Sequence, residues 1–259
     1  MTEKGTPAVD TFQRVEDKYA MTAEQAREVI RRCGEYIQKD RFFRYPVYSI
    51  YCDSDGADLA IRSLMKTGYK AKLRLRSYGD PDHSPIFLET KKKWGDIVYK
   101  KRIMLEEQEA YEYLRNGRKH HVHNNTAGEI DYMIRTRDLK PKVFIAYDRI
   151  CYSAVNEDDV RITFDMNIRY RLNDLDLHEN GSEKKLDCAE VMMEVKAMNR
   201  YPMWLTKILS DMKLYQSSFS KYGTIYSQNR NEMCRVPEST GRYASVYTEK
   251  ENILCSVQY

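Results

Sequence analysis

Residues 72–79, KLRLRSYG, form the stretch that decides the fold, because cationic and apolar side chains alternate along it. In an extended strand residues two apart point the same way, so Lys72, Arg74 and Arg76 share one face. The leucines between them take the opposite face, where they can join a core. The pattern predicts a strand with one apolar face and one cationic face, on which three like charges repel each other.

The same alternation appears in other parts of the chain. Lys100 and Arg102 share a strand face, and the stretch 160–171, VRITFDMNIRYR, alternates throughout. Its polar face is predicted to carry Arg161, Thr163, Asp165, Asn167, Arg169 and Arg171. A solvated outer face normally mixes Thr, Ser, Glu and Lys, whereas Arg and Lys recur here on several strands. We therefore expect the sheet to enclose a pocket or tunnel lined with cations.

Three Glu-x-Lys triplets add carboxylates to these faces. They are Glu16 to Lys18, Glu89 to Lys91 and Glu194 to Lys196. Each triplet places a carboxylate and an ammonium side by side on one strand face. The combination suits a chain of phosphates held partly by cations and partly through a divalent metal, since carboxylates bind such metals. Any single pair can equally be a simple ion pair, but the repetition favours a phosphate site.

Around these strands the sequence predicts mixed helix and strand structure. Residues 12–20 read as a strand, and Thr22 with Gln25 forms a capping box that begins a helix reaching about residue 39. The remaining elements are a meander over 45–53, 68–78, 85–93 and 96–105, a helical insertion over 106–140, strands over 142–154, 159–171 and 190–198, and an amphipathic helix over 201–215. The residues after Gly223 are polar with little periodicity, so we expect a mobile tail there.

Bulk composition indicates one compact soluble domain. The chain has 259 residues, of which 42% are hydrophobic, and its 43 basic and 39 acidic residues nearly balance, so net charge predicts no partner. No stretch reaches the roughly 18 apolar residues that a membrane helix needs, and the N-terminus lacks a signal-peptide pattern. Six cysteines without a C-x-x-C pair indicate reduced thiols. We expect a cytoplasmic protein that does not itself insert into a membrane.

Several motifs occur in a fixed order across residues 12–223. They are RVEDKYAM at 14–21, YPVYSIYCD at 45–53, KLRLRSYG at 72–79, FLETKKK at 87–93, VYKKRI at 98–103, AYDRICY at 146–152, DVRITFD at 159–165, MMEVKA at 192–197 and FSKYG at 219–223. Together they resemble the VTC domain, the catalytic polyphosphate polymerase domain of the vacuolar transporter chaperone complex. That family belongs to the triphosphate tunnel metalloenzymes of the CYTH-like superfamily.

The resemblance implies an α+β fold in which eight antiparallel strands form a tunnel barrel with flanking helices. The tunnel domain would span 12–223, and a polar C-terminal tail would span 224–259. The chain shows no recognisable SPX regulatory domain and no membrane segment, so it resembles the stand-alone catalytic domains of bacteria. A membrane partner protein could accept the polymer, which would place this protein at the inner face of a membrane.

The resemblance also assigns roles to individual residues. Catalytic positions are implied for Lys18, Arg74, Arg76, Lys91, Arg149, Arg161 and Glu194. Substrate phosphates would be bound by Lys100, Arg102, Lys196, Ser220 and Lys221. The cofactor would be Mn²⁺ or Mg²⁺, held by Glu194, with Glu16 and Glu89 as weaker candidates.

The expected function is that of a metal-dependent polyphosphate polymerase, with ATP and inorganic polyphosphate as its substrates. It would transfer the γ-phosphate of ATP onto the growing chain and release ADP. If water attacks instead, the same tunnel becomes a tripolyphosphatase or nucleoside triphosphatase. A non-catalytic polyphosphate-binding module is a third alternative, against which Glu194 argues, because a pure binder needs no metal ligand.

Two further interpretations are disfavoured. Nucleic-acid binding would suit a basic groove with many tyrosines, but no recognised nucleic-acid motif is present and the cations are paired with glutamates. His120, His121 and His123 match no usual zinc spacing, and we expect a structural or exposed role for them in a loop.

Overall fold

The computed structural model describes residues 14–65, 67–95, 97–157, 159–198 and 200–234. The strands are β1 (Arg14–Met21), β2 (Ile37–Asp53), β3 (Tyr69–Tyr78), β4 (Ile86–Trp94), β5 (Ile97–Leu105), β6 (Lys140–Ala154), β7 (Arg161–Arg171), β8 (Lys184–Lys185) and β9 (Val191–Met198). The helices are α1 (Ala23–Cys33), α2 (Asp58–Leu64), α3 (Glu107–Asn116), α4 (Asn125–Arg137), α5 (Met203–Asp211), α6 (Lys221–Gln228) and α7 (Arg230–Met233), with 3-10 turns η1 (Gly34–Tyr36) and η2 (Pro81–His83). This mixture confirms the predicted α+β class.

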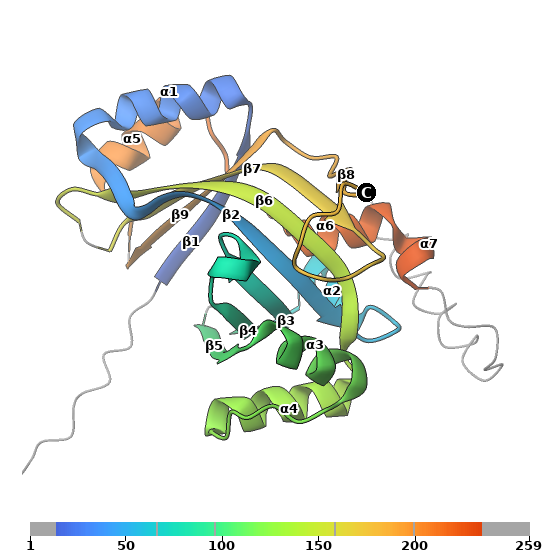
Figure 1. The fold of residues 1–259 in the computed structure, drawn as a ribbon. Helices are drawn as coiled ribbons and strands as arrows, with labels where there is room; N and C mark the ends of the chain where they lie inside the picture. The colour runs from blue at the N-terminus through green and yellow to red at the C-terminus, as the bar shows by residue number, and fades with distance from the viewer. Residues whose placement is uncertain (1–13, 66, 96, 158, 199, 235–259) are drawn as a thin grey trace, which may run out of the picture.

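The strands form one antiparallel sheet in the order β1-β9-β7-β6-β2-β3-β4-β5, and the short β8 pairs with β7. This path of eight strands confirms the predicted strand number. The long strands β2 and β6 curve, so that the sheet wraps round on itself (Figure 1). Lys91 Nζ on β4 lies 2.8 Å from Glu16 Oε1 on β1, and this ion pair joins the first strand of the order to the last but one across the interior.

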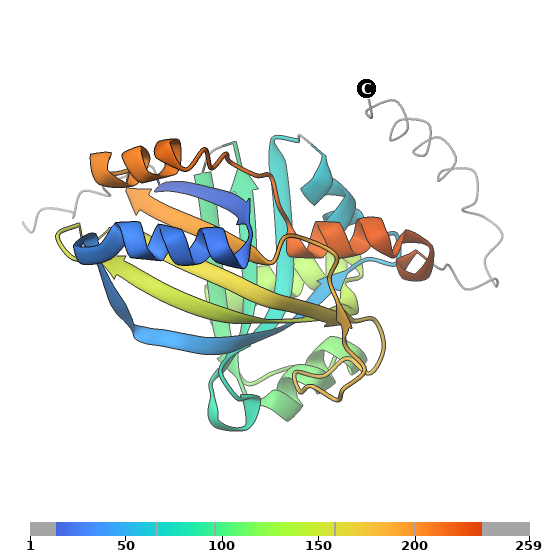
Figure 2. The ribbon, with the colours of Figure 1, turned by 90° about the horizontal axis from the view of Figure 1, so that it is seen from above.

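Two groups of helices cover the outer face of the sheet (Figures 1 and 2). Under α3 and α4, Ile130 shares a buried cluster with Leu73 and Leu88. Under α1 and α5, Val29 shares a second cluster with Phe164. Since the apolar side of β3 faces outward into this core, its cationic side faces the interior, as the alternation predicted.

Helix α6 closes one end of the interior. Tyr222 and Ile225 are buried there in a cluster with Val143 and Ile145 of β6. The ring of Tyr222 also stacks on that of Tyr51, with centroids 5.1 Å apart. Apolar packing therefore fills the α6 end of the tunnel and leaves the other part open.

The first helix ends earlier than predicted. Its beginning is confirmed, because Thr22 is the N-cap and forms the capping box with Gln25. However, Gly34 adopts a positive φ of 41° as C-cap and its N–H donates to Ile30 O, so the helix stops at Cys33 rather than near residue 39. The residues from Ile37 instead begin β2, which is 17 residues long.

The predicted start of the polar tail, at residue 224, also lies too early in the sequence. The predicted boundary at Gly223 falls inside α6, and α7 follows it. Ile225 and Tyr226 are buried, so these residues belong to the core rather than to a tail. Their apolar side chains are too few to produce a clear helical period, which is why the sequence pattern missed them. The rest of the expected tail, residues 235–259, lies outside the described residues.

A bulge interrupts the alternation of β7. The register with β6 shifts between Ala146 and Asp148, opposite Asn167, which has a positive φ of 52°. Beyond this point the faces exchange, and Arg169 pairs with Glu179 and Asp148 while Arg171 pairs with Asp176. The prediction that Asn167 and these two arginines continue the cationic face was therefore wrong.

Two expectations from composition can be examined in the described part of the chain. No helix there is both long enough and apolar enough to cross a membrane. Cys33, Cys52, Cys151, Cys188 and Cys234 are all free thiols, as predicted. The sixth cysteine, Cys255, lies outside the described residues.

Candidate functional site

The open part of the tunnel is a cavity of about 1390 Å³. Ten of its twenty lining residues are cations, namely Arg41, Arg44, Arg74, Arg76, Lys91, Lys100, Arg102, Arg149, Arg161 and Lys196. One lining residue is acidic, Glu16, and aromatic side chains such as Phe42, Tyr45 and Phe87 form much of the rest. The lining strongly favours an anionic occupant.

Strand register arranges the cations of β3, β4 and β5 in rows across the sheet. Lys72 lies beside Lys91, which lies beside Lys100. In the next row Arg74 and Arg102 flank Glu89. Like charges that lie directly opposite destabilise a sheet. The repulsion within the row of lysines must therefore be offset by nearby carboxylates.

Glu89 is the central carboxylate of this wall. Its side chain is 1% exposed, and it forms ion pairs with Arg74 Nη2 at 2.9 Å and with Lys100 Nζ at 2.8 Å. Burial raises the pKa of Glu89, but Arg74, Arg76 and Lys100 outweigh it and lower this pKa to about 2. Glu89 is thus a permanent counter-ion, and its two cationic partners compete with any metal for it.

Asp165 is the matching carboxylate on the opposite wall. Arg149 Nε and Nη2 donate to its two oxygens at 2.6 and 2.8 Å, and Lys221 Nζ donates at 2.6 Å. Burial raises the pKa of Asp165, but Lys221 and Arg149 outweigh it and hold this pKa below its usual range. The ion pair with Asp165 therefore ties Lys221, the first residue of α6, to strand β7.

Glu16 and Glu194 are neighbours on β1 and β9 within the interior. Glu194 Oε1 lies 2.6 Å from Lys196 Nζ. Burial raises the pKa of Glu194, but Lys196, Lys18 and Arg149 outweigh it and hold this pKa well below its usual range. The register of β1 with β9 places Glu16 opposite Lys196 and Glu194 opposite Lys18, so the two carboxylates are diagonal neighbours on one face. Two anionic oxygen donors fit a hard divalent cation such as Mg²⁺ or Mn²⁺.

Other predicted site residues point into the same space. Arg161 Nε lies 3.2 Å from Asp40 Oδ2, and Arg76 Nε donates to Ser49 Oγ at 2.9 Å. The guanidinium of Arg102 lies over the ring of Phe87 at 4.4 Å from its centroid. Arginines held in this way are oriented before any ligand arrives.

The structure brings the predicted site residues together from strands across the whole sheet and from α6. Five of the predicted residues are not in the cavity wall itself, namely Lys18, Glu89, Glu194, Ser220 and Lys221. Glu89 and Glu194 pair with lysines of the wall. Lys18, Ser220 and Lys221 lie together at the α6 end of the tunnel.

The Glu-x-Lys triplets differ in how their charges pair. The two members of a triplet pair with each other only in the case of Glu194 and Lys196, as far as the described residues show. In the other two triplets the glutamate pairs with cations from other strands. Glu16 forms an ion pair with Lys91, and Glu89 forms ion pairs with Arg74 of β3 and Lys100 of β5.

Sequence reasoning did not select Asp165, Asp40, Tyr51 or Lys72 as site residues. Asp165 and Lys72 do lie on the polar faces that the alternation defined, so that signal could have found them. Tyr51 gives no such signal, because a tyrosine on a strand is usually core. Its hydroxyl accepts from Arg74 Nη1 at 3.0 Å. Burial raises the pKa of Tyr51, but Arg74, Arg76 and Lys72 lower it to about 6.

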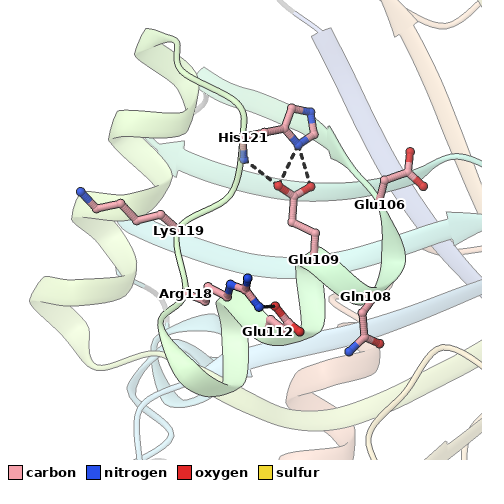
Figure 3. A pocket seen from close by; sticks show the side chains of 7 residues that line it. All are labelled: Glu106, Gln108, Glu109, Glu112, Arg118, Lys119 and His121. Carbon is pink, nitrogen blue, oxygen red and sulfur yellow. Dashed lines mark hydrogen bonds and ion pairs between the residues drawn. The ribbon is translucent and has the colours of Figure 1, made fainter.

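The three histidines of the loop between α3 and α4 take no part in the tunnel. His121 is exposed and pairs with Glu109 at 2.7 Å beside a surface pocket of about 490 Å³ (Figure 3). His123 is exposed as well, while His120 is buried against the ring of Tyr113. Their structural or exposed role was predicted.

A separate group of potential metal ligands lies outside the cavity wall. Asp82, Glu107 and His178 have ligand atoms within 4.8 Å of one another. Among the described residues, no other set of three such side chains comes this close together. Exposed carboxylates commonly pair with a histidine in this way, as Asp82 does with His178 Nε2 at 3.1 Å. The tunnel carboxylates Glu16 and Glu194 form a pair rather than such a group.

Fold and site together define a class of protein: an antiparallel sheet curled into a cation-lined tunnel that is closed at one end by a helix. The family model described as the VTC domain matches residues 13–229. The chain therefore belongs to the VTC domain family, as its motifs indicated.

Relatives of established name share part of this chain. Vacuolar transporter chaperone complex subunit 4 of Schizosaccharomyces pombe is 29% identical over 144 residues, which cover 47% of this chain and 20% of that protein. The subunit of the same name from Trypanosoma cruzi is 23% identical over 217 residues, covering 68% of this chain and 27% of that protein. The matched part of the chain thus spans 20% and 27% of the length of these two relatives. A crystal structure from Bacillus halodurans aligns with a TM-score of 0.49 and 13% identity, covering 80% of this chain and 95% of that chain.

Proposed function

We propose that this protein is a polyphosphate polymerase, which transfers the γ-phosphate of ATP onto a growing chain of inorganic phosphate and releases ADP. The observation that carries the proposal is the ratio of ten cations to one carboxylate in the cavity wall. A cavity of this size and lining suits a polyanion better than a compact, singly charged ligand. Membership of the VTC domain family supports the proposal, because the motifs that resemble this family imply a polyphosphate polymerase.

The charge problem of the reaction explains the lining. Joining ATP to a phosphate chain brings two polyanions together, and two unit charges about 4 Å apart repel by about 4 kcal/mol at an effective dielectric near 20. Arg74, Arg76, Arg149 and Arg161 can bind phosphate oxygens through two parallel hydrogen bonds, whereas lysines act as point charges. Since many of these side chains are already held in place, they lose little freedom when the phosphates bind.

Glu194, together with Glu16, would hold the divalent metal, and Glu89 is less available because Arg74 and Lys100 occupy it. A bound Mn²⁺ or Mg²⁺ would neutralise charge on the phosphoryl group. In the structure Lys196 pairs with Glu194, and Lys91 pairs with Glu16. If a metal bound to the two carboxylates, both lysines would be released to bind phosphate oxygens.

The reaction requires no side-chain nucleophile. The terminal phosphate of the growing chain is an anion at neutral pH and can attack the γ-phosphorus directly. The protein then contributes mainly by aligning the two substrates and neutralising their charge. Location in the cytoplasm and docking to a membrane protein that accepts the polymer belong to the same proposal.

The test is to incubate the purified protein with ATP and Mn²⁺ or Mg²⁺, to separate the products on a gel stained for polyphosphate, and to measure ADP and free phosphate. A ladder of long chains with stoichiometric ADP is the expected result, and a chelator should abolish it. Free phosphate without chains would replace the polymerase by a triphosphatase. Neither product, with retained binding of polyphosphate, would favour a binding module.

A further inference from the structure

The hairpin of β4 and β5 exposes a group of large apolar side chains at its tip. Trp94, Ile97, Val98 and Tyr99 are 70%, 52%, 42% and 53% exposed. A single exposed apolar side chain is common on a protein surface. Four of them on the two strands of one hairpin form a patch, and such patches mark interaction sites. We call these four residues the tip patch.

Strand register places the tip patch on both faces of the hairpin. Trp94 lies directly opposite Ile97, and Tyr99 lies on the same, outer face two residues further along β5. Val98 takes the other face and lines the cavity. The N–H of Gly95 donates to Gly68 O at 2.8 Å, which ties the tip to the chain just before β3. The apolar side chains therefore stand on a fixed support and not on a free loop.

Lysines flank the tip patch on both strands. Residues 91–101 contain five lysines and one acidic residue. On the outer face Lys92 lies directly opposite Tyr99, and both Lys92 and Lys101 pair with the same carboxylate, that of Glu129 on α4. On the other face Lys93 lies directly opposite Val98. Since two lysines share one carboxylate, the surroundings of the patch keep an excess of positive charge.

A membrane surface suits this combination better than a protein does. Trp and Tyr favour the boundary between water and lipid, and nearby lysines are attracted to anionic headgroups. A fluid lipid layer can surround a tip that is apolar on both faces, whereas a folded partner covers one face. A second copy of this chain would bring two sets of lysines together, and their charges repel each other.

We propose that the tip of the β4–β5 hairpin docks this protein on a membrane that contains anionic lipids. The apolar side chains enter the headgroup layer, and the flanking lysines contact the lipid phosphates. Because Val98 also lines the cavity, docking brings the rim of the tunnel close to the membrane. The inference goes beyond the proposed function, since the contact is with lipid and not with a partner protein, and it does not depend on the reaction in the tunnel.

The experiment measures binding to vesicles of phosphatidylcholine, with and without phosphatidylserine, by sedimentation and by tryptophan fluorescence. The chain has two tryptophans, so Trp204→Phe leaves Trp94 as the reporter. Vesicles with phosphatidylserine should sediment the protein and shift the emission of Trp94 to shorter wavelength, because the indole leaves water. Pure phosphatidylcholine should bind about tenfold or more weakly, since it lacks the attraction of anionic lipid for the lysines. Sodium chloride should weaken the binding to phosphatidylserine.

A double variant tests the tip itself. Trp94→Ser with Tyr99→Ser removes two exposed rings that are not among the residues lining the cavity. It should weaken vesicle binding about tenfold or more, because the apolar contact is lost. The matched control is Tyr132→Ser, which removes a ring that is 68% exposed on α4. Circular dichroism checks that both variants keep the fold.

Four results would overturn the inference. They are vesicle binding by the double variant that equals that of Tyr132→Ser, an unchanged Trp94 emission on vesicles that sediment the protein, equal binding to both kinds of vesicle, and binding to neither. The last result would leave a protein partner as the occupant. A dimer in solution that the double substitution breaks would likewise assign the tip to a second copy.

Two further measurements separate the tip from the tunnel. Displacement from vesicles by tripolyphosphate, but not by sodium chloride of equal ionic strength, would assign lipid binding to the tunnel cations and contradict the inference. Polymer formation by the double variant without vesicles should equal that of the wild type. The proposed function can therefore fail while the tip still binds lipid, and the tip can fail while the polymerase stands.

Discussion

Buried carboxylates balance the tunnel cations one residue at a time. Glu89 and Asp165 are almost fully buried, and each is held by two cations from other elements. Because a buried charge without its partner is costly, these carboxylates allow the cations to exist in an empty tunnel. They also determine how stability depends on pH.

We predict that Glu89→Gln destabilises the protein at pH 7 by about 3–5 kcal/mol, because Arg74 and Lys100 lose a buried counter-ion. The folded pKa of Glu89 is lowered to about 2 from 4.5. Its contribution is therefore fully present above about pH 4.5 and is lost as the pH falls toward 2. Urea denaturation at pH 7 and pH 3 should show a smaller difference between variant and wild type at the lower pH.

Glu129→Gln serves as the control, since Glu129 pairs with Lys92 and Lys101 in an exposed place on α4. It should change the free energy of unfolding by less than about 1 kcal/mol. An equal effect of the two substitutions at pH 7 would contradict the role of Glu89 as a buried counter-ion.

A second prediction at this scale concerns Glu194. Glu194→Gln removes the charge of a metal ligand but keeps the shape of the side chain, so polymer formation should fall on the order of 100-fold or more. Binding of tripolyphosphate should stay within a few-fold of the wild type, because the arginines that bind it remain. Turnover equal to that of Glu129→Gln would remove Glu194 from the metal site.

At the scale of elements, α6 is the part that pattern analysis missed. It brings Ser220 and Lys221 to the tunnel, and its Tyr222 hydroxyl donates to the buried Asp53 at 2.7 Å. Gly223 allows it to approach α2 closely, since a Cβ there would lie 2.8 Å from Leu64 Cδ2. Helix α6 therefore packs in the core and also supplies residues of the site.

We predict that Ile225→Ala lowers the free energy of unfolding by about 2–5 kcal/mol, because Ile225 is fully buried and its truncation leaves a cavity. Ser227→Ala, on the exposed side of the same helix, should change it by less than about 0.5 kcal/mol. Thermal and urea unfolding of both variants check this. Equal stability of the two would mean that residues after Gly223 do not pack as a helix.

At the scale of the whole molecule, curling the sheet concentrates cations that would otherwise face water. Their mutual repulsion opposes folding, and an anion that enters the tunnel relieves it. A ligand that binds only the folded state raises stability by mass action. The empty protein should therefore be less stable than the protein filled with phosphates.

We predict that tripolyphosphate raises the melting temperature in a concentration-dependent way, whereas the same concentration of sodium sulfate has a smaller effect. The shift should shrink as sodium chloride is raised from about 0.05 to about 0.5 M, because salt screens the contacts between lysines and phosphates. Differential scanning fluorimetry measures both. A shift that salt leaves unchanged would mean that charge does not dominate binding.

Much of the fold and part of the site were determined by the sequence alone. Period-two alternation decides which side of a strand is apolar, so the inward faces of Lys72, Arg74 and Arg76 followed from local geometry. The capping box at Thr22 is equally local and was correctly identified. The order of the motifs sufficed for the family, which the match over residues 13–229 confirmed.

Only the tertiary structure decided which charges meet. Glu16 and Lys91 are 75 residues apart in sequence, and Lys221 and Asp165 are 56 apart, yet both pairs are in contact. The bulge at Asn167 likewise depends on the register between β6 and β7, and beyond it the faces of the strand exchange. Alternation along one strand specifies a face but not the strand that comes to lie opposite, because that depends on how the whole sheet curls.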